Sequence, residues 1–163
     1  MTTHWSFPNR GDWATHDAKW RGNWSPYIPR NIMLRYSKEG DLVLDQFAGG
    51  GTTLVEAKLL NRDIIGVDVN DVALDRCKEK TNFEHEGANG KVYIHKGDAR
   101  NLDFLSDESI DLICTHPMPI LLNTAKILRK IYHILKSKTS LKKSQTTRQT
   151  GGLHLAYKAR FSS

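Results

Sequence analysis

The feature that most constrains the fold is a strand, a glycine turn and a helix that follow one another in the first third of the chain. Residues 42–47 are apolar except at Asp45 and Gln46, which is typical of a short buried strand. Three glycines at positions 49–51 come next, and residues 52–60 then predict a helix. Glycine permits a tight turn and lets a ligand approach the backbone closely. The amides of the first helical turn face the same crevice.

The motifs that the sequence lacks restrict the kinds of ligand that this turn can bind. The dinucleotide fingerprint fails because Leu54 stands where its third glycine belongs, and no Gly-Lys-Ser/Thr follows the glycines as a phosphate loop requires. What remains is an acid, Asp45, beside a turn without an anion-binding residue. This pattern favours a nucleoside-like ligand that carries a positive charge. A purely structural turn, which any α/β protein can contain, is the other interpretation.

Two later strands also end near acids. Residues 63–68 predict a second buried strand that ends at Asp68, about 20 residues beyond the glycine turn, where a carboxylate can hydrogen-bond a ribose. Residues 91–95 predict a third strand, which Asp98 follows. Because parallel strands bring their carboxyl ends to one edge of a sheet, we expect Asp45, Asp68 and Asp98 to surround one pocket.

A fourth strand over residues 109–115 ends at His116 and Pro117, opposite the glycine turn, where such folds place the reacting group. Helices are expected over residues 29–36, 52–60, 72–81 and 121–135. Strands that alternate with helices predict an α/β fold with a mostly parallel sheet.

The N-terminal segment, residues 1–28, is rich in Trp, Pro, Gly and His and is too apolar for a disordered leader. It either lines one side of the pocket or only covers the core.

The charged residues are distributed unevenly along the chain. Residues 1–111 carry a net charge of −4, whereas residues 112–163 carry a net charge of +10 and contain no acid. A basic segment of this kind suggests nucleic acid as a partner.

No apolar run approaches the ~20 residues that span a membrane, and the first residues lack the apolar core of a secretion signal. We therefore expect a cytoplasmic protein with no membrane partner. Cys77 and Cys114 fall in a predicted helix and a predicted strand, which favours reduced core thiols over a disulfide or a metal site.

Residues 43–53 read V-L-D-Q-F-A-G-G-G-T-T, which resembles the first motif of the DNA amino-methyltransferases, commonly V-L-D-x-F-x-G-S-G-T-T. Residues 25–30 match the segment that precedes this motif in the family, and residues 65–68 and 97–98 match later motifs. The resemblance covers residues 20–117. It implies a Rossmann-like class I methyltransferase fold with S-adenosyl-L-methionine as cofactor and DNA as partner. The implied reaction moves a methyl group to the exocyclic amine of adenine (N6) or cytosine (N4).

The resemblance also implies which residues contact the cofactor. They are Pro29, Arg30, Asp45, Phe47, Gly49, Gly51, Thr52, Asp68 and Asp98. Asp45 would hold the methionine end of the cofactor together with the two glycines, Asp68 would accept the ribose hydroxyls, and Asp98 would lie near the adenine. The segment around Pro29 and Arg30 would close the pocket.

The family's catalytic motif ends the fourth strand and reads Asp/Asn/Ser-Pro-Pro-Tyr/Phe. Its first side chain orients the amine of a flipped-out base towards the methyl group, and its ring stacks on the base. Here the chain reads Thr115-His116-Pro117-Met118-Pro119, so His116 and Pro117 carry over as catalytic residues, while the second proline and the ring do not. An active enzyme, an inactive fragment of one, an RNA methyltransferase and a non-catalytic nucleic-acid-binding remnant all stay open.

The basic tail offers a reason for the disrupted motif. With codons chosen freely, residues 118–136 can be read one base earlier as Y-A-N-I-I-K-Y-S-E-D-I-E-E-D-I-S-H-I-K. This shifted sequence supplies the missing ring and restores acids. We therefore hypothesise that the chain is frame-shifted after residue 117 or close to it.

The expected organisation has three parts: an aromatic segment (1–28), a cofactor-binding core (29–117), and a basic helix with a poorly structured tail (118–163). The core is an incomplete form of the fold, with four strands in the spatial order 3-2-1-4. The fourth strand would then be an exposed apolar edge, which promotes aggregation.

Overall fold

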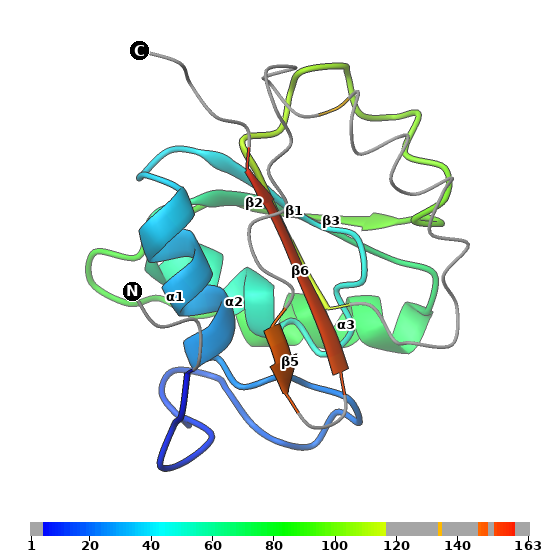
Figure 1. The fold of residues 1–163 in the computed structure, drawn as a ribbon. Coiled ribbons are helices and arrows are strands. Elements are labelled where there is room, and N and C mark those ends of the chain that lie inside the picture. The colour runs from blue at the N-terminus through cyan, green and yellow to red at the C-terminus, as the bar shows by residue number, and fades with distance from the viewer. Residues whose placement is uncertain (1–4, 117–133, 135–146, 150–151, 159–163) are drawn as a thin grey trace.

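The computed structural model of the chain describes residues 5–116, 134, 147–149 and 152–158 (Figure 1). The helices are α1 (Tyr27–Tyr36), α2 (Thr52–Leu59) and α3 (Asp71–Thr81). The strands are β1 (Leu42–Asp45), β2 (Asp63–Asp68), β3 (Val92–Lys96), β4 (Leu112–Thr115), β5 (Thr147–Gln149) and β6 (Gly152–Lys158). Strands and helices alternate from β1 to β3, as the sequence predicts.

The strands form one sheet in the order β3-β2-β1-β4-β6-β5. The first four of these strands run parallel, so the expected order 3-2-1-4 is confirmed. After β1 the chain builds outwards through β2 and β3, and it then returns to place β4 on the other side of β1. The strand order therefore reverses between β1 and β4, and the carboxyl ends of the strands flank a crevice at such a switch point.

The C-terminal tail completes the sheet. β6, the long red arrow in Figure 1, pairs antiparallel with β4, so that Leu112 lies opposite Lys158 and Thr115 opposite Leu155. β5 pairs antiparallel with β6. The expectation that β4 is an exposed edge is therefore wrong. The weak alternation of residues 153–161 allows a strand, but its pairing with β4 is a contact between distant segments that local sequence patterns do not encode.

The helix expected over residues 121–135 and the catalytic-motif residue Pro117 lie outside the described residues. Ile134 is the exception in that region, since it is helical and fully buried. In the described parts of the chain, no helix is both long enough and apolar enough to cross a membrane.

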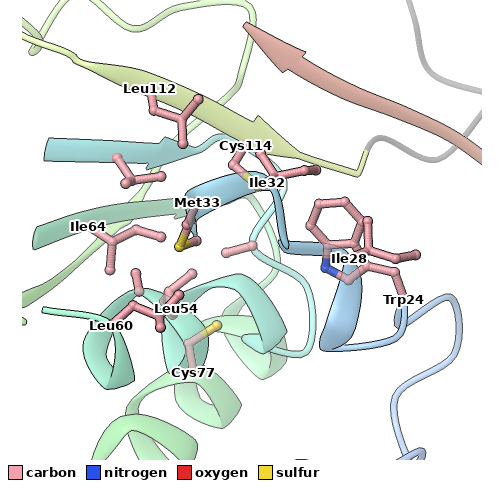
Figure 2. Packing of buried hydrophobic residues seen from close by; sticks show 13 residues of the cluster. Trp24, Ile28, Ile32, Met33, Leu54, Leu60, Ile64, Cys77, Leu112 and Cys114 are labelled. Carbon is pink, nitrogen blue, oxygen red and sulfur yellow. The ribbon is translucent and has the colours of Figure 1, made fainter. Parts of the chain in front are cut away.

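Apolar cores lie on both faces of the sheet. Figure 2 shows the first, in which side chains of α1, α2 and α3 pack against the strands, among them Met33, Leu54 and Ile64. The second core contains Leu44, Val67, Leu102, Leu105, Ile110, Ile113 and Ile134. The central strands β1 and β4 are buried on both faces, so their sequences are almost continuously apolar, whereas β3 at the edge alternates between half-buried and exposed residues. This leaves the carboxyl ends of the strands as the place where polar side chains gather.

Candidate functional site

The glycine turn between β1 and α2 has a backbone that glycine adopts more readily than other residues. Gly49 and Gly51 lie in the left-handed region, with φ of +49° and +80°. A side chain at Gly50 would place its Cβ 2.6 Å from Asn23 Oδ1 and 2.7 Å from Trp20 Cβ. The turn is therefore in direct contact with the N-terminal segment. The N-cap of α2 has no side-chain hydrogen bond, so the amides of its first turn stay open to a ligand.

A cavity of about 460 Å³ opens at the carboxyl ends of the parallel strands, within the usual size range of small-molecule sites. Asp45, Asp68, Asp98 and His116 all line it, each from the end of a different strand or the turn that follows. The glycine turn forms its floor, and residues 20–24 of the N-terminal segment form another wall. The structure thus brings all three acids to one hollow.

Asp45 is the most deeply buried of these acids, with 1% of its surface exposed. Its Oδ1 accepts hydrogen bonds from Thr115 Oγ1 (2.7 Å) and from the backbone N of Phe47 (3.1 Å). Burial raises the pKa of Asp45 to about 6, although these hydrogen bonds oppose the rise. A cationic ligand in the cavity would favour the ionised form of this acid.

Asp68 joins the end of β2 to the glycine turn. Its Oδ2 accepts a hydrogen bond from Gly49 N (2.9 Å), and its Oδ1 accepts one from Asn70 N (3.0 Å). Each carboxylate oxygen can accept a second hydrogen bond, so the group can still bind a hydroxyl. The N–H of Gly51 likewise donates within the turn, to Ala48 O (2.9 Å). These two glycines therefore shape the turn but do not offer their N–H groups to a ligand.

Asp98 lies at the mouth of the cavity after β3. Its carboxylate accepts hydrogen bonds from the backbone N (2.8 Å) and the Nε (2.9 Å) of Arg100. The hydrogen bonds of the Arg100 side chain, joined by that of its backbone, lower the pKa of Asp98 to about 2. Asp98 is therefore ionised at neutral pH and can accept a hydrogen bond from an amino group.

His116 follows β4 and lines the cavity. Its ring stacks on Trp24, with centroids 5.4 Å apart and planes 10° apart. Burial lowers the pKa of His116, while a hydrogen bond with the Gly22 backbone opposes the change. The imidazole is therefore neutral at pH 7, and a neutral ring can accept a hydrogen bond from an amine.

Most of the site residues expected from the sequence line this one cavity. They are Asp45, Phe47, Gly49, Thr52, Asp68, Asp98 and His116. Gly51 is not in the wall, since a Cβ there would face Cys77 Sγ at 3.3 Å. Pro29 is buried in α1, and Arg30 binds Glu56 of α2, so neither lines the cavity.

The N-terminal segment was expected either to line the pocket or to cover the core, and different parts of it do each. Trp5 and Phe7 pack against the core, whereas Trp20 and Trp24 line the cavity. Sequence reasoning did not single out Arg100 or Gln46 as cavity residues. The sequence signal that could have identified them is their place within two residues of Asp98 and Asp45. Within the described residues, no group of three or more His, Cys, Asp or Glu side chains could hold a metal ion.

Models of two protein families match the chain. Residues 1–79 match a family described as DNA methylase, and residues 43–138 match a family described as methyltransferase domain. The second match covers more than half of the chain and contains the glycine turn, Asp68, Asp98 and His116.

Two relatives are similar over parts of the chain. The type II methyltransferase M2.DpnII of Streptococcus pneumoniae is 42% identical over 60 residues, which are 37% of this chain and 22% of that protein. A tRNA (guanine(10)-N2)-dimethyltransferase of Methanothermobacter thermautotrophicus is 35% identical over 97 residues, which are 59% of this chain and 27% of that protein. The matched region thus spans about a quarter of the length of these relatives.

The fold is also found in a solved structure, that of a putative S-adenosyl-L-methionine-dependent methyltransferase of Methanococcus maripaludis. The two structures superpose with a TM-score of 0.64 over 85% of this chain and 86% of the other, at 16% sequence identity. At that identity the likeness establishes a Rossmann-like methyltransferase fold. Together with this fold, the match over residues 43–138 shows that the chain belongs to the S-adenosylmethionine-dependent methyltransferases, and its first 79 residues are similar to the DNA methylase family.

Proposed function

We propose that the chain is a site-specific DNA methyltransferase, or an inactive fragment of one, that acts on the exocyclic amine of adenine or cytosine. The observation that carries this proposal is the shared cavity, because it brings Asp45, Asp68 and Asp98 together with His116. The acids suit the charged and hydroxyl groups of the cofactor, and His116 occupies the first position of the family's catalytic motif. The partial likeness to type II methyltransferases supports DNA as the substrate.

The residues of the cavity fit S-adenosylmethionine. Gly49 and Gly50 line the cavity and carry no side chain, so a ligand can lie close to their backbone. Asp68 would hold the ribose hydroxyls with its remaining acceptor positions, and Asp98 would accept a hydrogen bond from the adenine amino group. Asp45 would hold the positively charged methionine end. When bound, the cofactor supplies an electrophilic methyl group on a positively charged sulfur.

The chain's own contribution to transfer is to hold the target amine in line with that methyl group. The neutral ring of His116 can accept one N–H of the amine, which directs the nitrogen lone pair away from His116. Its stack on Trp24 fixes the ring plane against the N-terminal wall. The target base would still lack the stacking ring of the family motif, since Met118 and Pro119 stand at the end of that motif. We therefore expect cofactor binding to be retained and methyl transfer to be slow or absent.

An RNA substrate is the second candidate. The relative from Methanothermobacter thermautotrophicus is named as a tRNA dimethyltransferase, and its match covers more of this chain than the match to M2.DpnII. A non-catalytic nucleic-acid-binding remnant is the third, because residues 112–163 carry a charge of +10 that suits phosphates.

A two-step experiment separates these candidates. Calorimetric titration with S-adenosylhomocysteine should detect binding to the parent chain and weaker binding to Asp45→Ala and Asp68→Ala. Unchanged affinity in both variants would contradict the site. Transfer of labelled methyl groups is then measured on duplex DNA and on structured RNA. Label in RNA alone would favour the second candidate, and nucleic-acid binding without affinity for S-adenosylhomocysteine would favour the third.

A further inference from the structure

A fully buried carboxylate joins the N-terminal segment to α2. Glu56 has no exposed surface, and it lies on the helix that follows the glycine turn. Its Oε1 accepts a hydrogen bond from Trp13 Nε1 (2.7 Å) and pairs with His16 Nε2 (2.7 Å), and its Oε2 accepts one from Arg30 Nη1 (2.9 Å). We name Glu56, Trp13, His16 and Arg30 the Glu56 hub. None of the four lines the cavity.

A second set of contacts fixes the same segment to α3. Asp17 accepts hydrogen bonds from Arg76 Nη2 (2.6 and 2.8 Å) and forms an ion pair with Lys80 Nζ (3.1 Å). Arg10 then closes the loop, because its guanidinium donates to Asp17 O (3.3 Å) and to Asn23 O (3.0 Å). Residues 10–23 are thus held at both ends and in the middle.

This loop carries the wall of the cavity. Trp20 and Asn23 occupy the space against Gly49 and Gly50, so close that a Cβ on Gly50 would overlap both. Any displacement of the loop would therefore open the cavity beside the glycine turn. Two members of the Glu56 hub, Trp13 and His16, precede this wall by only a few residues, and their contacts with buried Glu56 fix the loop to the helix of the turn.

We infer that Glu56 and Arg30 are positioning residues of the cofactor site, which act through the wall formed by residues 20–24. The resemblance to the family places Arg30 at the closure of the pocket, but in this chain its guanidinium binds Glu56 instead. Loss of Arg30 leaves Oε2 of Glu56 buried without its partner, and loss of the Glu56 charge weakens its contacts with Trp13 and His16. Either change loosens the attached segment. The inference rests on the proposed function, since the wall matters only if the cavity binds the cofactor.

The test compares two ligands on the full chain. S-adenosylhomocysteine and 5′-methylthioadenosine share the adenosine, but only the first carries a carboxylate and an ammonium group. If Arg30 acts through the wall, Arg30→Met and Glu56→Gln each weaken both ligands by a similar factor of about ten, or about 1.4 kcal/mol. The double variant should be no weaker than the worse single one, because both changes disrupt one hub. Arg30→Lys should recover part of the loss.

A spectroscopic signature separates positioning from general loss of stability. The chain has four tryptophans, which give four fluorine resonances after incorporation of 5-fluorotryptophan. In the parent, S-adenosylhomocysteine should shift the resonances of Trp20 and Trp24, and in the hub variants this shift should shrink while circular dichroism stays unchanged. Asp75→Asn is the matched control, since it breaks an exposed ion pair with Lys78 on α3 (2.9 Å) and should change neither affinity nor spectrum.

Three results would overturn the inference. A loss confined to S-adenosylhomocysteine would mean that Arg30 contacts the cofactor carboxylate directly. Additive losses in the double variant would mean that Arg30 and Glu56 act separately, and unchanged affinity in every variant would mean that the hub has no influence on the site. If Glu56→Gln unfolds the chain, the half-exposed Arg30 still permits the test through Arg30→Met and Arg30→Lys. Failure of the parent to bind either ligand would instead contradict the proposed function.

Discussion

Asp45 is an acid whose surroundings oppose its charge, and this makes the stability of the chain depend on pH. Its pKa of about 6 in the folded state compares with an ordinary value of about 3.9. Below pH ~4 both the folded and the unfolded state hold the proton, so the cost of ionising the buried acid is absent. The cost grows as the pH rises from about 4 to 6, and above pH 6 it reaches about 3 kcal/mol.

We therefore expect Asp45→Asn to gain stability over the parent as the pH rises from 4 to 7, by up to about 3 kcal/mol. Urea unfolding at a series of pH values measures this difference. The affinity for S-adenosylmethionine should move in the opposite sense: in the parent it should rise through pH 6, because the cationic ligand favours ionised Asp45, and in Asp45→Asn it should be flat. A pH-independent affinity in the parent would show that Asp45 does not meet the charged end of the cofactor.

Asp68 has two tasks that one substitution can separate. Asp68→Asn keeps an oxygen that can accept the N–H of Gly49 or Asn70, but it lacks a charged acceptor for the ribose. We expect the affinity for S-adenosylhomocysteine to fall about tenfold by calorimetry, with a loss of about 1 kcal/mol in stability because one of the two backbone N–H groups loses its acceptor. Asp71→Asn is the control, since it breaks an exposed pair with Lys96 (2.7 Å) and should leave the affinity unchanged. Equal losses in the two variants would point to a general charge effect.

At the scale of elements, the glycine turn depends on the absence of a side chain at position 50. Gly50→Ala would force a Cβ into Trp20 and Asn23, so the N-terminal wall must shift. We expect a loss of about 1–3 kcal/mol in stability together with weaker binding of S-adenosylhomocysteine. Gly87→Ala makes a useful contrast, because Gly87 has φ of +78° but nothing within 4 Å of the added Cβ. It should cost some stability through strain and leave binding unchanged.

The sequence predicts best those elements that depend on a local pattern of apolar residues. Buried apolar runs that end at Asp45 and Asp68 mark parallel strands, and parallel strands bring their ends to one edge. The convergence of these acids follows from that geometry. The partner of Arg30 could not be predicted in this way, because Glu56 is a single acid within an apolar helix and looks like a solvent-facing residue. Its role emerges only when the N-terminal segment folds over α2.

At the scale of the whole molecule, one part of the sheet could be predicted from local sequence patterns and another part could not. The order β3-β2-β1-β4 follows from the βαβ connections, whereas the addition of β6 beside β4 pairs two segments that lie far apart in the sequence. β6 covers the edge that an incomplete methyltransferase sheet would expose. Backbone pairing needs no particular side chains, so even a tail of unusual composition can close a sheet edge.

The composition of that tail leads to the last prediction, which concerns the gene. Fifty-two residues without one acid follow a domain that holds all 18 acids of the chain, and no requirement of folding explains so abrupt a change. We expect the coding DNA, read one base earlier from about codon 118, to give an open frame that begins with Tyr after a proline and regains acids. The protein made from that frame should bind S-adenosylhomocysteine as the present chain does, since Asp45, Asp68 and Asp98 precede the shift. It should also transfer methyl groups to duplex DNA faster, because it restores the ring that stacks on the target base. A stop codon within the first few shifted codons would refute the hypothesis, and the basic tail would then be an original part of this methyltransferase.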